Sequence, residues 1–152
     1  MSILPHLLKH YSEQDIFNAD ETGLFWLMLP QRTLEFKGKV CTGSKHNKER
    51  TTVLLCANMI DSNKLQAFVI GKSAALRYFR GVKQLPVKYT ANKKSWMTSK
   101  IWETWLHQLD WKMKCEQRKI LLLIDNCPAR PKVLSLQNVK VVYIPPNTTA
   151  KL

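Results

Sequence analysis

The segment 119–125, with the sequence KILLLID, is the feature that most constrains the fold of this 152-residue chain. Its apolar residues follow one another without alternation, which is typical of a strand buried on both faces in the middle of a sheet. The carboxylate of Asp125 ends the run, and a turn-forming sequence through Pro128 follows it. The segment therefore predicts a central strand of an α/β sheet with an acidic side chain at its end.

Other segments predict the rest of such a sheet, because they combine β-branched and apolar residues and are bounded by turn-forming residues. The predicted elements are strands at 16–20, 51–60, 65–70, 119–125 and 139–144, and a helix at 96–114. The strands 51–60 and 65–70 are expected to form a hairpin across the turn 61–64. Five further segments have less definite patterns: another strand or an ordered loop at 24–29 and 32–36, a basic loop at 37–50, mixed structure at 72–89, and a short helix or extended turn at 131–136.

The predicted helix carries a wide apolar stripe. Ile101, Trp105 and Leu109 recur every four residues, which is typical of a helix that packs on a sheet. Thr98 or Ser99 is expected to cap its first turn. We expect the tryptophans of this segment to belong to the core rather than to stack on nucleic-acid bases.

The charge of the chain favours a polyanionic partner. Twenty-four basic residues against 11 acidic ones give a net charge of +13, and a field of this sign attracts nucleic acid. A basic face that only maintains solubility is the alternative. No apolar stretch reaches the roughly 20 residues that span a bilayer, and we find no signal peptide, so we expect no membrane partner and an intracellular protein.

Two aspartates follow predicted strands. Asp20 ends the strand 16–20, and Asp125 ends the strand 119–125. If these strands are neighbours, both carboxylates lie at one edge of the sheet, where they suit a hard divalent ion that activates phosphodiester chemistry. The alternatives stay open here: Asp20 as a helix cap or turn residue before Gly23, and Asp125 with Asn126 as an Asx turn.

Five strings, in order along the chain, resemble the DDE superfamily endonuclease domain of Tigger transposable element-derived proteins. This is the pogo branch, which is related to Jerky-type proteins and centromere protein B. The strings are NADETGLFW (18–26), SKHNKERTTVLLCANM (44–59), YTANKKSWMT (89–98), KILLLIDNCPAR (119–130) and VVYIPPNTTAKL (141–152).

The resemblance implies an α/β fold, a ribonuclease H-like mixed sheet with flanking helices. It also implies DNA strand cleavage and joining with Mg²⁺ or Mn²⁺, in which Asp20 and Asp125 are the catalytic residues and metal ligands. On this basis residues 1–14 are expected to be a lead-in or linker remnant. Residues 15–152 are expected to be a DDE-type domain that is C-terminally incomplete and lacks its last helix.

The chain also departs from the family pattern. The family has a third carboxylate after the segment that corresponds to 145–149, whereas Asp125 is the last acidic residue here. Arg130 stands where the family usually has histidine. We expect weak metal binding and a DNA-binding domain whose ancestral cleavage activity is lost. The alternative is an active endonuclease core whose third carboxylate is missing because the chain is a fragment.

The basic residues suggest where DNA would be held. We expect contacts to the DNA backbone rather than to base edges, with a solvated basic face as the alternative. The resemblance implies a nuclear protein. The sheet face without its last helix is expected to be apolar, and to favour self-association or a protein partner. The candidate phosphate contacts are Lys45, Lys48, Arg50, Lys93, Lys94 and Arg130.

Overall fold

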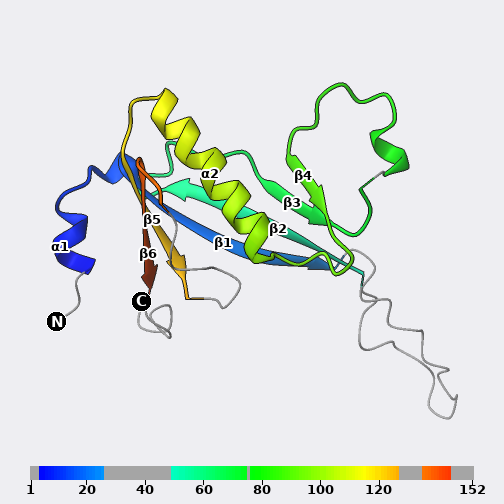
Figure 1. Cartoon of the computed structure of the whole chain (residues 1–152), viewed down its shortest axis with the longest axis horizontal. Coiled ribbons are helices and arrows are strands. Elements are labelled where there is room, and N and C mark those ends of the chain that lie inside the picture. Colours follow the sequence, from blue (N-terminus) through cyan, green and yellow to red (C-terminus); the bar gives the residue numbers. More distant parts are fainter. Residues whose placement is uncertain (1–3, 26–48, 75, 127–134, 145–152) are drawn as a thin grey trace, which may run out of the picture.

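The computed structural model describes residues 4–25, 49–74, 76–126 and 135–144. These residues form one six-stranded sheet in the order β4-β3-β2-β1-β5-β6, with a long helix across one face (Figure 1). The strands are β1 (Ile16–Phe25), β2 (Arg50–Asn58), β3 (Phe68–Gly71), β4 (Lys88–Ala91), β5 (Ile120–Asp125) and β6 (Val139–Ile144). The helices are α1 (Leu4–Leu8) and α2 (Ser99–Cys115), with 3₁₀ turns η1 (Glu13–Asp15) and η2 (Arg77–Phe79).

The sheet is mixed, as predicted. β1 pairs with β2, and β2 with β3, in antiparallel fashion, whereas β1–β5, β5–β6 and β3–β4 are parallel pairs. β5 lies between β1 and β6. Five of its six residues are apolar, and of these only Leu123 is not fully buried. The prediction of a central strand is therefore confirmed.

The length of β1 corrects the first prediction. Its pairing with β2 continues to Phe25, opposite Arg50, so Asp20 lies inside a ten-residue strand rather than at its end. The interpretation of Asp20 as a cap or turn residue is wrong, because pairing with β2 holds this backbone extended on both sides of it. Of the strand or loop predicted at 24–29 and 32–36, only residues 24 and 25 are described, and they form the end of β1.

Two further predictions change. The antiparallel pairing of β2 with β3 is confirmed, but the turn is longer than the four residues predicted. Lys64 forms a bridge with Ala57, and regular pairing begins only at Phe68. The strand β4, with the sequence KYTA, was not predicted, because it is short, polar and stabilised by parallel pairing with β3. Residues 131–134 of the predicted short helix lie outside the described residues, as do 37–48 of the basic loop.

Helix α2 supplies one half of the core. The Thr98 side chain accepts a hydrogen bond from the Ile101 amide, which confirms the predicted cap. Trp102 and Trp105 stack with ring centroids 5.2 Å apart and are buried against the sheet. Trp96 and Trp111 are exposed, so the prediction that the tryptophans belong to the core is wrong for these two.

Among the described residues, no helix has the length and apolar character needed to cross a membrane.

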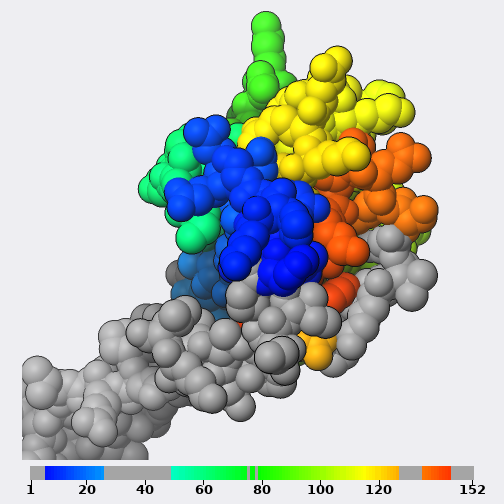
Figure 2. Space-filling model, turned by 90° about the vertical axis from the view of Figure 1, so that its left-hand side faces the viewer, coloured from blue at the N-terminus to red at the C-terminus, as the bar shows by residue number. Residues whose placement is uncertain are grey.

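An ion pair fixes the N-terminal segment to the start of β5. The Arg118 guanidinium donates to Asp15 Oδ1 at 2.6 Å and 3.0 Å and to the Gln14 carbonyl at 3.1 Å. Hydrogen bonding to Asp15 raises the pKa of Arg118, so the guanidinium stays charged. Figure 2 shows the N-terminal residues packed at this end of the molecule, below the C-terminal end of α2.

A second polar contact holds β6 in place. Asp110 Oδ1, on α2, accepts hydrogen bonds from the backbone amides of Gln137, Asn138 and Val139, at 3.1, 2.7 and 3.0 Å. One carboxylate therefore satisfies three donors where the chain enters β6.

We predict that Asp110→Ala destabilises the protein by about 1–3 kcal/mol, because it leaves these amides without their acceptor. Denaturant unfolding measures the change. Glu103→Ala, which removes the same charge from the same helix, is the matched control and is expected to cost less than about 0.5 kcal/mol. Equal losses in the two variants would contradict the assignment.

Candidate functional site

The two predicted site aspartates come from neighbouring strands. The parallel register of β1 and β5 ends with Ala19 beside Ile124, and the next residue of each strand is an aspartate, Asp20 and Asp125. Strand spacing therefore separates their backbones by only about 5 Å. Both side chains are exposed, on the sheet face opposite α2, since Ala19 and Ile124 are buried under α2. We call this pair the carboxylate edge.

The carboxylate edge offers oxygen ligands to a divalent ion. Asp20 Oδ1 accepts a hydrogen bond from the Glu21 amide at 2.8 Å, which orients the carboxylate. A magnesium-type ion is commonly held by one or two carboxylates with water completing its shell, so the donor chemistry fits in part. Among the described residues, no group of three or more His, Cys, Asp or Glu side chains is placed to hold a metal.

Apolar side chains border the carboxylate edge. Leu55 lies opposite Asp20 in the register of β1 and β2 and is 53% exposed. Leu24, on the same face of β1, is 52% exposed. Such side chains suit the predicted apolar face, while its use for self-association or for a protein partner stays a prediction.

The basic residues gather in a different place. A hollow of about 450 Å³ lies where β1 ends, β2 begins and the β4–α2 connection turns. Four cationic side chains and one acidic side chain, that of Glu49, line it. Glu49 Oε1 lies 3.9 Å from Lys72 Nζ. We call this hollow the basic hollow. Its lining residues are Phe25, Glu49, Arg50, Lys72, Lys93, Lys94, Ser95 and Trp96.

The connection that carries two of these lysines is a tightly bonded turn. The Asn92 side chain accepts from the amides of Lys94 and Trp96 and donates to the Trp96 carbonyl at 2.6 Å. Ser95 is buried with a φ of 53°, a left-handed conformation that is uncommon for serine. The buried Thr52 hydroxyl donates to the Ser95 carbonyl at 2.7 Å and so ties the turn to β2.

Arg50 lines the basic hollow and contacts both Thr52 and Trp96. Its Nε donates to Thr52 Oγ1 at 3.3 Å, and its Cζ lies 5.2 Å from the centroid of the Trp96 ring, a cation–π contact. Gly23 makes room for it, because a Cβ at that position would lie 3.0 Å from Arg50 Nε. The close approach of the Arg50 side chain to the backbone thus explains the glycine at position 23, which does not form a turn.

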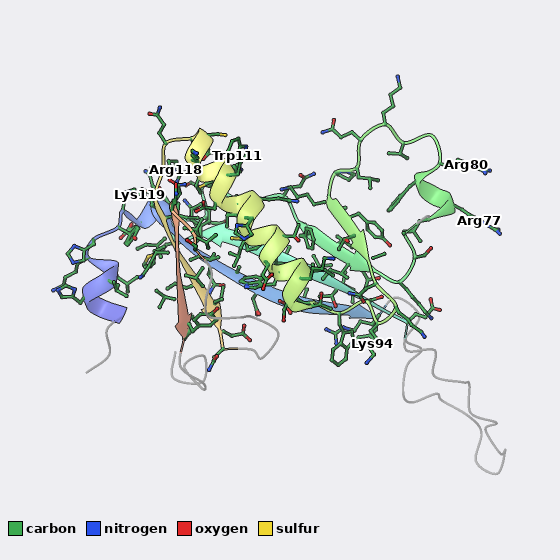
Figure 3. The ribbon with its side chains drawn as sticks, in the orientation of Figure 1. Arg77, Arg80, Lys94, Trp111, Arg118 and Lys119 are labelled. Atoms are coloured by element: carbon green, nitrogen blue, oxygen red, sulfur yellow. The ribbon has the colours of Figure 1, made fainter. Side chains whose placement is uncertain are left out.

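Three of the six predicted phosphate contacts meet in the basic hollow, namely Arg50, Lys93 and Lys94. Lys45, Lys48 and Arg130 lie outside the described residues. Figure 3 shows Lys94 beside the end of β1 and the beginning of β2. It also shows Arg77 and Arg80 pointing outward from η2. Lys72 belongs to a basic group of the sequence, with Arg77, Arg80 and Lys83, that could follow a DNA backbone. Trp96 was not predicted as a lining residue, although the string KKSW at 93–96 contains the signal, an aromatic residue among polar and basic ones.

Comparison with protein families identifies residues 48–152 as a match to the family described as DDE superfamily endonuclease. Tigger transposable element-derived protein 4 of Mus musculus is 42% identical over 144 residues, which cover 95% of this chain and 28% of that protein. Major centromere autoantigen B of Homo sapiens is 36% identical over 152 residues, covering 97% of this chain and 24% of that protein. The chain thus spans about a quarter of the length of these relatives.

Comparison with solved structures identifies a similar fold. A Mos1 transposase paired-end complex with left transposon end contains a chain that matches 97% of this one, with a TM-score of 0.54 and 13% identity, over 41% of that chain. The likeness at this identity concerns the fold, and it confirms the predicted ribonuclease H-like mixed sheet.

We predict that Thr52→Val loosens the turn at 92–96, because the Ser95 carbonyl loses a buried donor at a cost of about 1–3 kcal/mol. Amide hydrogen exchange of this turn is expected to accelerate more than that of α2. Thr51→Val, one residue earlier and on the opposite sheet face, is the control and is expected to leave exchange unchanged. Equal exchange in both variants would show that Thr52 does not hold the turn.

Proposed function

Since this chain belongs to the DDE superfamily endonucleases, we propose that it is a transposase-derived domain that binds DNA through its basic hollow. The observation that carries the proposal is the convergence of Arg50, Lys72, Lys93 and Lys94 from three separate parts of the sheet. Their charge outweighs the single acid, Glu49, and a cluster of this sign attracts phosphate. The structural relative named as a complex with a transposon end supports a DNA partner.

We further propose that Asp20 and Asp125 are the catalytic positions of the family's chemistry and would hold Mg²⁺ or Mn²⁺. When bound, such an ion activates an attacking oxygen and neutralises a leaving one. The chain's own contribution is to orient Asp20 through the Glu21 amide and to keep both carboxylates on one exposed edge.

In this proposal the 152-residue polypeptide binds DNA without cutting it. Phosphoryl transfer relies on metal ions held between the attacking and leaving oxygens, and two carboxylates give two ions few protein ligands. Among the residues that the structure describes, no third His, Cys, Asp or Glu side chain is placed beside Asp20 and Asp125 to hold a metal. Metal binding is accordingly weak. An active endonuclease core is the competing function, supported by the family match over residues 48–152.

The domain extent and location follow from the same argument. We propose that residues 15–152 form the DDE-type domain and that residues 1–14 lead into it, joined to it by the hydrogen bond that Arg118 donates to the Gln14 carbonyl at 3.1 Å. A nuclear location fits a DNA partner and a relative whose name refers to the centromere.

We predict that DNA binding falls steeply with salt, because cations that neutralise phosphates release counterions. Lys93→Gln combined with Lys94→Gln is expected to weaken binding to all duplex sequences alike and to reduce the log–log salt slope by about 2. Fluorescence anisotropy between low and physiological salt measures both. Lys114→Gln, at the other end of α2, is the control. An affinity that does not change with salt would contradict the proposal.

We predict no nicking of supercoiled plasmid and no strand transfer by this polypeptide in Mg²⁺ or Mn²⁺. Gel electrophoresis of the plasmid provides the measurement. Nicking that disappears in both Asp20→Asn and Asp125→Asn would overturn this prediction and favour the active endonuclease core.

A further inference from the structure

Trp96 is unusual among the large apolar side chains of this molecule because cations surround an exposed ring. The side chain is 55% exposed, and one face of the ring is covered by the Arg50 guanidinium. Phe25, also in the basic hollow, is 43% exposed. Exposed aromatic rings among lysines and arginine are the combination with which proteins hold unpaired nucleotides, since bases stack on the rings while the cations follow the backbone.

We propose that the basic hollow binds an unpaired nucleotide of a DNA strand, with its base stacked on Trp96 and its phosphates held by Lys93, Lys94 and Lys72. This inference rests on the proposed DNA binding and adds a preference for single-stranded over duplex DNA. The base must be unpaired because both faces of a base inside a duplex are covered by its neighbours. A hollow of about 450 Å³ lies within the size range of small-molecule sites.

The Trp96 ring is held in position by hydrogen bonds of the residues around it, without a bound ligand. Arg50 is fixed below the ring by its bond to Thr52, and the backbone on either side of Ser95 is fixed by Asn92 and Thr52. Ser95 adopts its left-handed conformation at this point, and backbone strain of this kind concentrates where a binding loop must be held in one shape. A rigid aromatic ring loses little conformational entropy on binding.

The basic hollow is distinct from the carboxylate edge. Asp20 and Phe25 lie five residues apart on β1, which corresponds to about 17 Å along an extended strand. The two side chains also point to opposite faces of the sheet, because residues five apart on a strand alternate in direction. The stacked nucleotide would therefore lie apart from the phosphodiester bond beside Asp20 and Asp125.

A second exposed tryptophan provides a matched control. Trp111 is 64% exposed and has the Lys114 ammonium 5.3 Å from its ring centroid. It lies near the end of α2 that is remote from Lys94 (Figure 3). The hollow beside it is lined by Lys88 as its one lysine, and that side chain bonds to Gln108 at 3.3 Å. Trp111 thus reproduces the exposed ring and its cation without the group of lysines.

The test measures the affinity of the whole chain for dT20 and for a blunt 20-base-pair duplex at one salt concentration. We expect Trp96→Ala to weaken dT20 binding about tenfold or more while duplex binding changes less than twofold. Trp96→Phe, which keeps a stacking ring, is expected to retain most of the affinity. Trp111→Ala is expected to change neither. Quenching of tryptophan fluorescence by dT20 is expected in the wild type and in Trp111→Ala, and to be lost in Trp96→Ala.

The outcomes separate this inference from the proposed function. If the wild type binds neither DNA, both are overturned. If it binds both with steep salt dependence and Trp96→Ala weakens them equally or not at all, DNA binding stands and the nucleotide site is overturned. Circular dichroism and denaturant unfolding establish whether each variant is folded. If Trp96→Ala does not fold, the comparison of Trp96→Phe with the wild type supplies the test.

Discussion

The parallel pairing of β1 with β5 is the contact on which the rest of the structure depends. It joins two segments that are distant in the sequence, and it places Phe17 and Ala19 beside Leu122 and Ile124 on the face that α2 covers. Burial of this face supplies the main stabilisation, because apolar area removed from water contributes about 25 cal/mol per Å². The same register brings Asp20 beside Asp125, so the core and the carboxylate edge have one origin.

The elements that the sequence predicted well are those whose own residues determine their environment. The apolar run of β5 has few alternatives to a central strand, and the stripe of α2 with its Thr98 cap defines a helix. β4 was missed because parallel pairing with β3 stabilises it, and no local pattern reports that pairing. The end of β1 was placed five residues early because pairing with β2 stabilises a stretch through Gly23 whose own sequence is typical of a turn.

The two parts of the candidate site differ in the same way. The neighbouring positions of Asp20 and Asp125 followed from two strand patterns and one assumption about strand order, which the structure confirms. The basic hollow needs the ends of β1, β2, β3 and β4 in register, and β4 was the strand that was not predicted. Arg50, Lys93 and Lys94 were therefore identified by type, whereas their meeting around Trp96 could only come from the tertiary structure.

The distance between the carboxylate edge and the basic hollow determines how their functions are coupled. At physiological ionic strength charges are screened over about 8 Å, and the two parts lie about twice that distance apart along β1. The lysines of the basic hollow therefore do little to reduce the repulsion between Asp20 and Asp125. In the proposed function that pair would hold a metal ion without their help. In the proposed function, DNA at the basic hollow would need no metal ion, because cations bind phosphate directly. A chain of this fold that lost its metal chemistry would keep the proposed DNA contacts, since the two rest on different residues and on electrostatic interactions that act independently.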